Sequence, residues 1–176
     1  MDVMLPKRKK PFAKSHFIAI GANLPGPDGT KPLAVCFAAI TAIAALPWVM
    51  HAARSPWYST GPIPASDQPR YVNGMLRIEA DIHPETLLTS LQCIETRFGR
   101  SRSAPNAART LDLDIVDSAG LIRDSPDPIL PHPRAHTRAF VLLPLRDVAP
   151  DWRHPRTGEG IAALIAALPP QDVRLL

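Results

Sequence analysis

The sequence predicts an α+β fold in which strands and helices follow one another in the order βαββαβ. Three observations predict it. Four short apolar or alternating runs are typical of strands, in which side chains two positions apart share a face. Between them, two longer segments carry apolar residues at helical spacing. The order is the split βαβ arrangement of a ferredoxin-like sandwich, with a mainly antiparallel four-stranded sheet and helices on one face.

The first strand is expected at residues 17–21, Phe-Ile-Ala-Ile-Gly, and a loop rich in Gly, Pro, Asn and Asp follows it. Thr30 is positioned to cap the next helix, with Pro32 in its first turn. Pro47 then stops this helix near Leu46.

The second strand is expected at residues 48–59, and a long Pro-containing loop over residues 60–70 separates it from the third. Residues 71–79 alternate, so Tyr71 and Asn73 are expected on one strand face. The second helix is expected to begin at Pro84 and to end at Gly99.

The last strand is expected at residues 110–116, after an arginine-rich loop that lacks periodicity. Residues 126–158 are expected to contain loops with one or two short helical turns, and residues 159–168 a final helix. Together they form a helical C-terminal extension. We therefore expect residues 1–15 to be a disordered basic tail and residues 16–176 to be a single domain.

The net charge of +4 is located in the tail, because the first sixteen residues hold five basic side chains and one acidic one. The neutral remainder argues against a nucleic-acid-binding surface. Cys36 and Cys93 match no disulfide framework or zinc spacing, so both are expected to be buried, reduced thiols of a cytoplasmic protein. The uncharged run over residues 33–50 is interrupted by Pro47 and is interpreted as a buried helix rather than a membrane span.

The strongest local feature is the motif Thr110-Leu-Asp-Leu-Asp-Ile115. Asp112 and Asp114 would share one strand face, and two carboxylates so close repel each other unless a cation lies between them. Magnesium prefers one or two carboxylates together with substrate phosphates. The alternative is an edge strand with ordinary surface aspartates.

Arg100, Arg102 and Arg109 lie in the loop that enters this strand and could bind a polyphosphate. A solvated polar loop would have the same composition. The sequence contains no Walker A motif and no candidate nucleophile triad. His132 lies in a distinctive Leu-Pro-His-Pro-Arg segment, but taken alone a structural histidine is the favoured interpretation. Tyr71 with Asn73 could hold a flat heterocycle, although a solvent-facing Tyr and Asn are ordinary on a strand.

Taken in order, these motifs resemble the hydroxymethyl-dihydropterin pyrophosphokinase family over about residues 17–155. The motifs that carry the resemblance are Ile20-Gly-Ala-Asn-Leu24, Tyr58-Ser-Thr60, Asp67-Gln-Pro-Arg-Tyr-Val-Asn73, Pro84-Glu-Thr-Leu-Leu88, Ile94-Glu-Thr-Arg-Phe-Gly-Arg100, Arg109-Thr-Leu-Asp-Leu-Asp-Ile115, Leu130-Pro-His-Pro-Arg134 and Arg138-Ala-Phe140.

The resemblance implies a role for each matching residue. Asp112 and Asp114 match carboxylates that bind two magnesium ions. The residues matching the mobile catalytic loop and its phosphate contacts are Arg100, Arg102 and Arg109. Those matching ATP contacts are Gln92, His132 and Arg138, with Ile115 beside the adenine. Those matching pterin contacts are Tyr71, Asn73 and Phe140, with additional backbone contacts near Thr60 and Ile63. Glu95 matches a carboxylate next to the site.

The chain also departs from the family pattern. A Trp-Gly-Pro segment common before the arginine of the aspartate motif is replaced by Asn106-Ala-Ala108, in a loop one residue shorter. Ala22 replaces a serine and Gly61 a proline. Asp127 and Ile129 replace two further nucleotide contacts, which are therefore not transferred.

The function implied by the resemblance is the transfer of pyrophosphate from ATP to the hydroxymethyl group of 6-hydroxymethyl-7,8-dihydropterin in folate biosynthesis. The expected partners are these two small molecules, with no nucleic acid and no membrane, and the protein is expected to be a monomer. Three alternatives stay open: a slow or non-catalytic pterin-binding paralogue, another metal-dependent transferase that shares only the aspartate pair, and a ferredoxin-like nucleic-acid-binding module.

Overall fold

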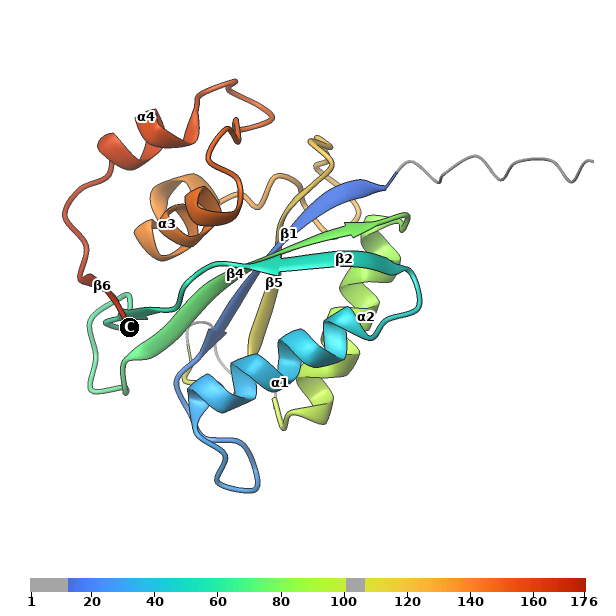
Figure 1. Cartoon of the computed structure of the whole chain (residues 1–176). Coiled ribbons are helices and arrows are strands. Elements are labelled where there is room, and N and C mark those ends of the chain that lie inside the picture. The colour runs from blue at the N-terminus through green and yellow to red at the C-terminus, as the bar shows by residue number, and fades with distance from the viewer. Residues whose placement is uncertain (1–12, 101–106) are drawn as a thin grey trace, which may run out of the picture.

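The computed structural model describes residues 13–100 and 107–176, so the tail up to residue 12 and Arg102 lie outside the described residues. Its elements confirm the expected order and add to it (Figure 1). They are β1 (Lys14–Ala22), α1 (Pro32–Ala44), β2 (Val49–Arg54), β3 (Tyr58–Thr60), β4 (Tyr71–Ala80), α2 (Pro84–Arg97), β5 (Asp112–Ser118), a 3-10 turn (Ala135–Thr137), α3 (Ala139–Val148), α4 (Ile161–Ala166) and β6 (Val173–Leu175).

The sheet is antiparallel at every pairing, as predicted, but it has six strands instead of four. The strand order is β5-β1-β4-β3-β6, and β2 also pairs with β4. Two features of the structure account for the two additional strands. The expected strand at residues 48–59 is divided in two at Ser55 and Pro56, because proline has no N–H to continue the ladder. The short strand β6 was not predicted.

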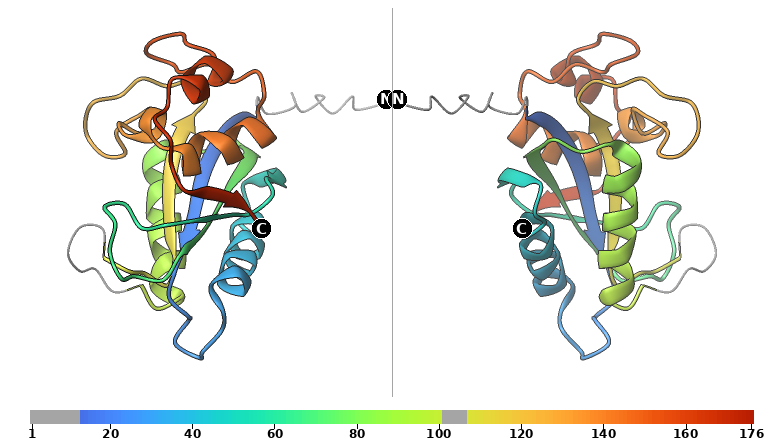
Figure 2. Two further views of the ribbon diagram at one scale, coloured as in Figure 1. Left: turned by 90° about the vertical axis from the view of Figure 1, so that its left-hand side faces the viewer. Right: turned by 90° about the vertical axis from the view of Figure 1, so that its right-hand side faces the viewer.

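One face of the sheet packs against α1 and α2, as Figures 1 and 2 show. Ile18 and Ile20 of β1 are buried there against Val35 and Ile43 of α1 and Leu91 of α2. This apolar layer confirms the two predicted helices and their inward faces. The helix cap was predicted wrongly, because Lys31 occupies the N-cap of α1 without a side-chain hydrogen bond. Gly99, with φ +79°, follows the end of α2 as expected.

The opposite face of the sheet is partly covered by α3 and α4 (Figure 1). Met75 of β4 packs there with Leu142 and Leu145 of α3 and Leu164 of α4. The sequence predicted only one or two helical turns in this region. In the structure Pro144 lies inside the ten-residue helix α3, where it removes one helical hydrogen bond without ending the helix.

Smaller differences concern the ends of the chain and the cysteines. β1 begins at Lys14, inside the range predicted to be a disordered tail. Cys36 is buried as predicted, but Cys93 is exposed on α2, so its prediction was wrong. Among the described residues no helix combines the length and apolar character needed to cross a membrane.

Candidate active site

The centre of the site is a row of residues that crosses three neighbouring strands. Gly21 of β1 pairs with Asn73 of β4 on one side and with Asp112 of β5 on the other. Two residues earlier, Ala19 pairs with Asp114. Adjacent strands lie about 4.8 Å apart, so the backbones at Asn73 and Asp112 are separated by roughly 10 Å. The register therefore places the amide and the carboxylate on opposite sides of a floor made of small residues.

The floor at Gly21 has little room for a side chain. A Cβ atom at this position would lie 3.3 Å from Asn73 Oδ1 and 3.9 Å from the Cβ of Asp112. The absence of a side chain keeps the surface between the two polar groups open. A ligand can therefore lie directly against the backbone of β1.

A cleft of about 330 Å³ lies above this floor, on the face that α3 only partly covers. The predicted site residues that line it are Thr60, Ile63, Tyr71, Asn73, Arg109, Asp112, Asp114, His132, Arg138 and Phe140. The structure thus gathers residues from five separate segments into one cavity. Its size falls within the range of small-molecule sites.

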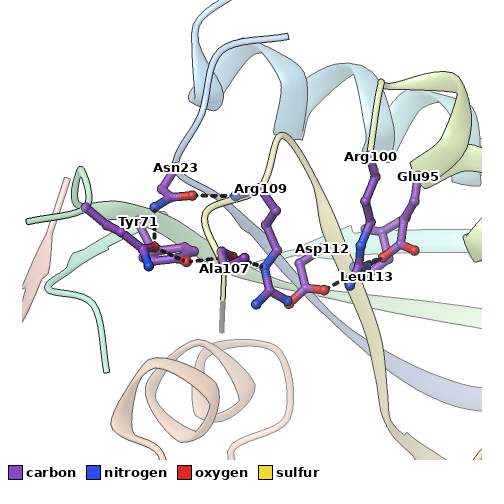
Figure 3. Close-up of polar contacts among 9 residues, drawn as sticks. Asn23, Tyr71, Glu95, Arg100, Ala107, Arg109, Asp112 and Leu113 are labelled. Atoms are coloured by element: carbon purple, nitrogen blue, oxygen red, sulfur yellow. Dashed lines mark hydrogen bonds and ion pairs between the residues drawn. The ribbon is translucent and has the colours of Figure 1, made fainter. Parts of the chain in front are cut away.

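Asp112 and Asp114 both project from β5 toward this cleft, as the alternating pattern predicted. Asp112 Oδ2 lies 2.7 Å from Arg109 Nη1, and Asp112 Oδ1 lies 2.8 Å from Arg100 Nη1 (Figure 3). Burial is the largest cause, and repulsion from Asp112 the second, of a rise in the pKa of Asp114 to about 6. A cation bound beside Asp112 would offset the repulsion that raises the pKa of Asp114.

The donor set fits magnesium only in combination with a substrate. In the parts of the chain that the structure describes, no group of three or more His, Cys, Asp or Glu side chains could hold a metal. Asp112 and Asp114 provide two hard oxygen ligands, which is the usual protein contribution to a magnesium ion that also binds phosphates.

Glu95 connects α2 to the aspartate strand. Its Oε1 atom accepts a hydrogen bond of 2.7 Å from the backbone N–H of Leu113, and the same atom pairs with Arg100 (Figure 3). Burial raises the pKa of Glu95 to about 7. Glu95 thereby aligns Arg100 with Asp112 from the rear of β5, which agrees with its expected place beside the site.

The opposite end of the cleft combines aromatic and amide groups. Asn73 Nδ2 donates a 2.8 Å hydrogen bond to Thr60 Oγ1, which fixes the orientation of the amide. The hydroxyl of Tyr71 donates to Gln68 Oε1 at 3.0 Å. Phe140 lines the same cleft from α3, and the Arg138 guanidinium carbon lies 5.4 Å from its ring centroid. These groups provide stacking surfaces and hydrogen-bonding edges for a flat polar ring.

His132 is a half-buried member of the cleft wall. Burial, with further contributions from Arg138 and Arg134, lowers its pKa from 6.5 to about 4. The imidazole is therefore neutral at neutral pH, and each ring nitrogen has a fixed role as donor or acceptor.

We expect NMR titration of the His132 ring to show an inflection near pH 4. The neutral ring is favoured in the folded state, so its contribution to stability is complete above pH 6.5 and is lost as the pH falls through about 4. An inflection for His132 between pH 6 and 7 would contradict this prediction.

Three of the predicted residues that the structure describes do not line the cleft, and one of them, Arg100, pairs with Asp112 instead. Ile115 is only 4% exposed and packs in the core beneath α1 and α2, because odd-numbered positions of the aspartate motif face away from the carboxylates. Its backbone lies in β5, the edge strand of the sheet. Gln92 lies on α2, outside the cleft lining. The position of Arg102 lies outside the described residues.

Asn23 is a site residue to which the sequence reasoning gave no role. It is 2% exposed, its Oδ1 accepts a 2.8 Å hydrogen bond from Arg109 N, and its Nδ2 donates to Pro69 O at 3.2 Å. The backbone N–H groups of Asn23 and Leu24 both donate to Arg109 O at 3.1 Å. Asn23 therefore joins the start of the aspartate motif to the loop before β4. Its only signal in the sequence was its place in the Ile20–Leu24 motif.

Replacing Asn23 with alanine should lower the free energy of unfolding by about 2–3 kcal/mol, because the Arg109 N–H and the Pro69 carbonyl would lose buried partners. Urea denaturation followed by tryptophan fluorescence measures this change. Asp28→Ala, in the exposed part of the same loop, removes one side-chain acceptor and should cost far less. Equal effects of the two substitutions would contradict the role of Asn23.

Known proteins resemble this chain in sequence and in fold. Residues 17–150 match the family described as 7,8-dihydro-6-hydroxymethylpterin-pyrophosphokinase (HPPK). A 2-amino-4-hydroxy-6-hydroxymethyldihydropteridine pyrophosphokinase of Pseudomonas aeruginosa is 39% identical over 160 residues, covering 91% of this chain and 95% of that protein. The protein of the same name from Haemophilus influenzae is 37% identical, covering 77% of this chain and 81% of its own length.

A solved structure of Plasmodium falciparum HPPK-DHPS, with pterin and p-hydroxybenzoate, shares the fold with a TM-score of 0.61 and 12% sequence identity. The match covers 94% of this chain and 45% of that longer chain. It supports the α+β architecture described above.

Proposed function

The chain belongs to the 7,8-dihydro-6-hydroxymethylpterin-pyrophosphokinase family, and from this premise we propose that it transfers pyrophosphate from ATP to 6-hydroxymethyl-7,8-dihydropterin in folate biosynthesis. The products are AMP and the pterin diphosphate. The observation that supports this most directly is the row Asn73, Gly21 and Asp112, which places an amide beside aromatic rings at one end of the cleft and paired carboxylates at the other.

In the proposed reaction the hydroxymethyl oxygen of the pterin attacks the β-phosphorus of ATP. The bond between that phosphorus and the oxygen bridging to the α-phosphorus breaks, and AMP leaves with the bridging oxygen. The attacking hydroxyl releases its proton to solvent. No protein nucleophile takes part, so the protein contributes mainly positioning and charge stabilisation.

The residues divide this work between the two ends of the cleft. Asp112 and Asp114 hold the magnesium, for which we propose two ions, and bound magnesium neutralises charge on the phosphates. Arg100 and Arg109 already point at Asp112 and are placed to bind phosphate oxygens. Tyr71 and Phe140 stack on the pterin, and Asn73 binds its hydrogen-bonding edge. His132 and Arg138 bind the nucleotide, and β5 near Ile115 lies beside the adenine.

The roles assigned to Gln92 and Arg102 remain predictions, as do a monomeric state, a cytoplasmic location and the absence of nucleic-acid partners. The neutral body of the chain, with its acidic pair in the cleft, argues against the nucleic-acid-binding alternative. The slow-paralogue alternative rests on Asn106-Ala-Ala108 and is decided by rate alone.

The test is to incubate the protein with ATP, magnesium and 6-hydroxymethyl-7,8-dihydropterin and to separate the nucleotide products. We expect AMP to form in proportion to pterin diphosphate and only when the pterin is present. Formation of ADP would instead indicate attack at the γ-phosphorus. If neither AMP nor ADP rises above the pterin-free control, the catalytic function is excluded. A pterin-binding paralogue then remains, and quenching of tryptophan fluorescence by pterin would detect it.

A further inference from the structure

The C-terminal segment contacts both walls of the cleft although it follows the family match, which ends at residue 150. In Figure 2 this segment descends from α4 to the sheet. There β6 pairs with β3, with Val173 opposite Thr60, and the N–H of Leu176 donates to Trp57 O at 2.9 Å. The chain end is thereby fixed beside the loop that begins at Thr60.

Gln171 holds the wall formed by the start of α3. Its Oε1 atom accepts a 2.9 Å hydrogen bond from Ala139 N, and its Nε2 atom donates to Thr137 O at 3.0 Å. The N-cap residue of α3, Arg138, makes no capping hydrogen bond through its side chain. Because the first N–H groups of a helix have no partner within it, Gln171 acts as the cap from a distant part of the chain.

The two residues that Gln171 contacts are sequence neighbours of two proposed ligand-binding residues. Arg138 lies between Thr137 and Ala139, and Phe140 follows directly in the first turn of α3. Both line the cleft. The two hydrogen bonds therefore fix the backbone from which these side chains reach the ligands.

The neighbouring Asp172 holds the opposite wall. Its carbonyl oxygen accepts a 3.3 Å hydrogen bond from Gly61 N, and its carboxylate pairs with Arg70. Arg70 in turn donates to Ser59 Oγ at 2.9 Å. Both ends of the 60–70 loop, which carries Ile63 into the cleft, are thus attached to one C-terminal residue.

We propose that Gln171 is a positioning residue for pterin binding, and that the Gln171–Asp172 pair sets the separation between the α3 wall and the 60–70 loop. The proposal rests on the proposed function, because the walls that it joins are the two sides of the pterin site. Neither residue touches the ligands or the reacting atoms. Their effect passes through the backbones at Ala139 and Gly61.

The test compares Gln171→Ala and Gln171→Glu with a matched control, Leu175→Thr. The alanine removes both hydrogen bonds, whereas the glutamate keeps an acceptor for Ala139 N and adds a charge that the helix N-terminus favours. Leu175 is 65% exposed in β6, and threonine keeps a strand-forming residue there. All assays are run well below each variant's unfolding midpoint, so that loss of folded protein does not contribute.

We expect Gln171→Ala to raise the KM for the pterin alcohol about tenfold while changing kcat less than about threefold, because the hydrogen bonds of the Gln171 side chain go to Thr137 and Ala139 and not to the residues proposed for phosphate and metal binding. Gln171→Glu should recover part of this loss, because it restores the acceptor for Ala139 N but not the donor to Thr137 O, and Leu175→Thr should match the parent. Unchanged KM in Gln171→Ala, or an equal rise in the Leu175→Thr control, would overturn the proposal.

Amide hydrogen exchange separates this proposal from the proposed function. The Ala139 amide should exchange faster in Gln171→Ala than in the parent and slower again in Gln171→Glu, whether or not AMP is formed. Unchanged protection at Ala139 would refute the contact itself. Altered protection with normal pterin KM would leave Gln171 purely structural and would also reject the proposal, whereas absence of AMP in the parent would reject only the proposed function.

Discussion

Replacing Asp112 with asparagine should reduce AMP formation at least about a hundredfold, because it removes a preorganised charge from a site whose chemistry is largely electrostatic. The substitution keeps the shape of the side chain, and Asp112 is only partly buried, at 22% side-chain exposure. The fold should therefore persist. Steady-state measurement of AMP at saturating ATP and pterin gives the size of the loss.

The cause of that loss can be isolated with two comparisons. In Asp112→Asn, Arg100 and Arg109 lose their shared carboxylate, so part of the effect could come from movement of these arginines. Raising the magnesium concentration should restore activity partially if metal affinity is the main loss. Asp124→Asn changes an acid that is 79% exposed and should leave the rate unaltered. Near-normal activity of Asp112→Asn would refute the assigned mechanism.

Replacing Gly21 with valine should abolish pterin binding at a smaller cost in stability, because the Asn73 side chain must shift to make room for the new Cβ. Gly21 lies in the central strand β1, where valine favours strand structure over glycine. Its Cβ would lie 3.3 Å from Asn73 Oδ1, and the two methyl groups beyond it would occupy the cleft floor. The pterin would then lose access to Asn73.

The measurement is a fluorescence titration with pterin, together with thermal unfolding of the same samples. Gly21→Ala places only the Cβ at the floor and should weaken binding by a smaller factor, which provides a graded comparison. Parent-like pterin affinity in Gly21→Val would show that the ring does not lie across β1. A large fall in the unfolding temperature would show that the side chain cannot be directed into the cleft.

Much of this arrangement could be predicted from sequence because it depends on short-range periodicity. The alternation at Asp112 and Asp114 placed both carboxylates on one face, and the helical spacing of Leu87, Leu91 and Ile94 identified the buried side of α2. These patterns record which face of an element is apolar. The family motifs then identified ten of the residues that line the cleft.

The remaining features depend on contacts between distant segments, which leave little periodic signal. Asn23 acts through hydrogen bonds to residues 46 and 86 positions away, and Gln171 caps a helix that begins 32 positions earlier. β6 has only three residues, and α3 contains a proline that local propensity treats as a break. For Ile115, the alternation that located the aspartates already placed its side chain in the core.

The difference in length between α3 and β4 affects the size of the molecule that the cleft can admit. Both elements have ten residues, but at 1.5 Å per residue the helix extends about 15 Å, whereas at 3.3 Å per residue the strand extends about 33 Å. One layer therefore ends while the other continues, and the cleft lies where β4 extends beyond α3. Changing the number of turns in α3 should alter the size of molecule that is admitted, without any change to the chemistry on β5.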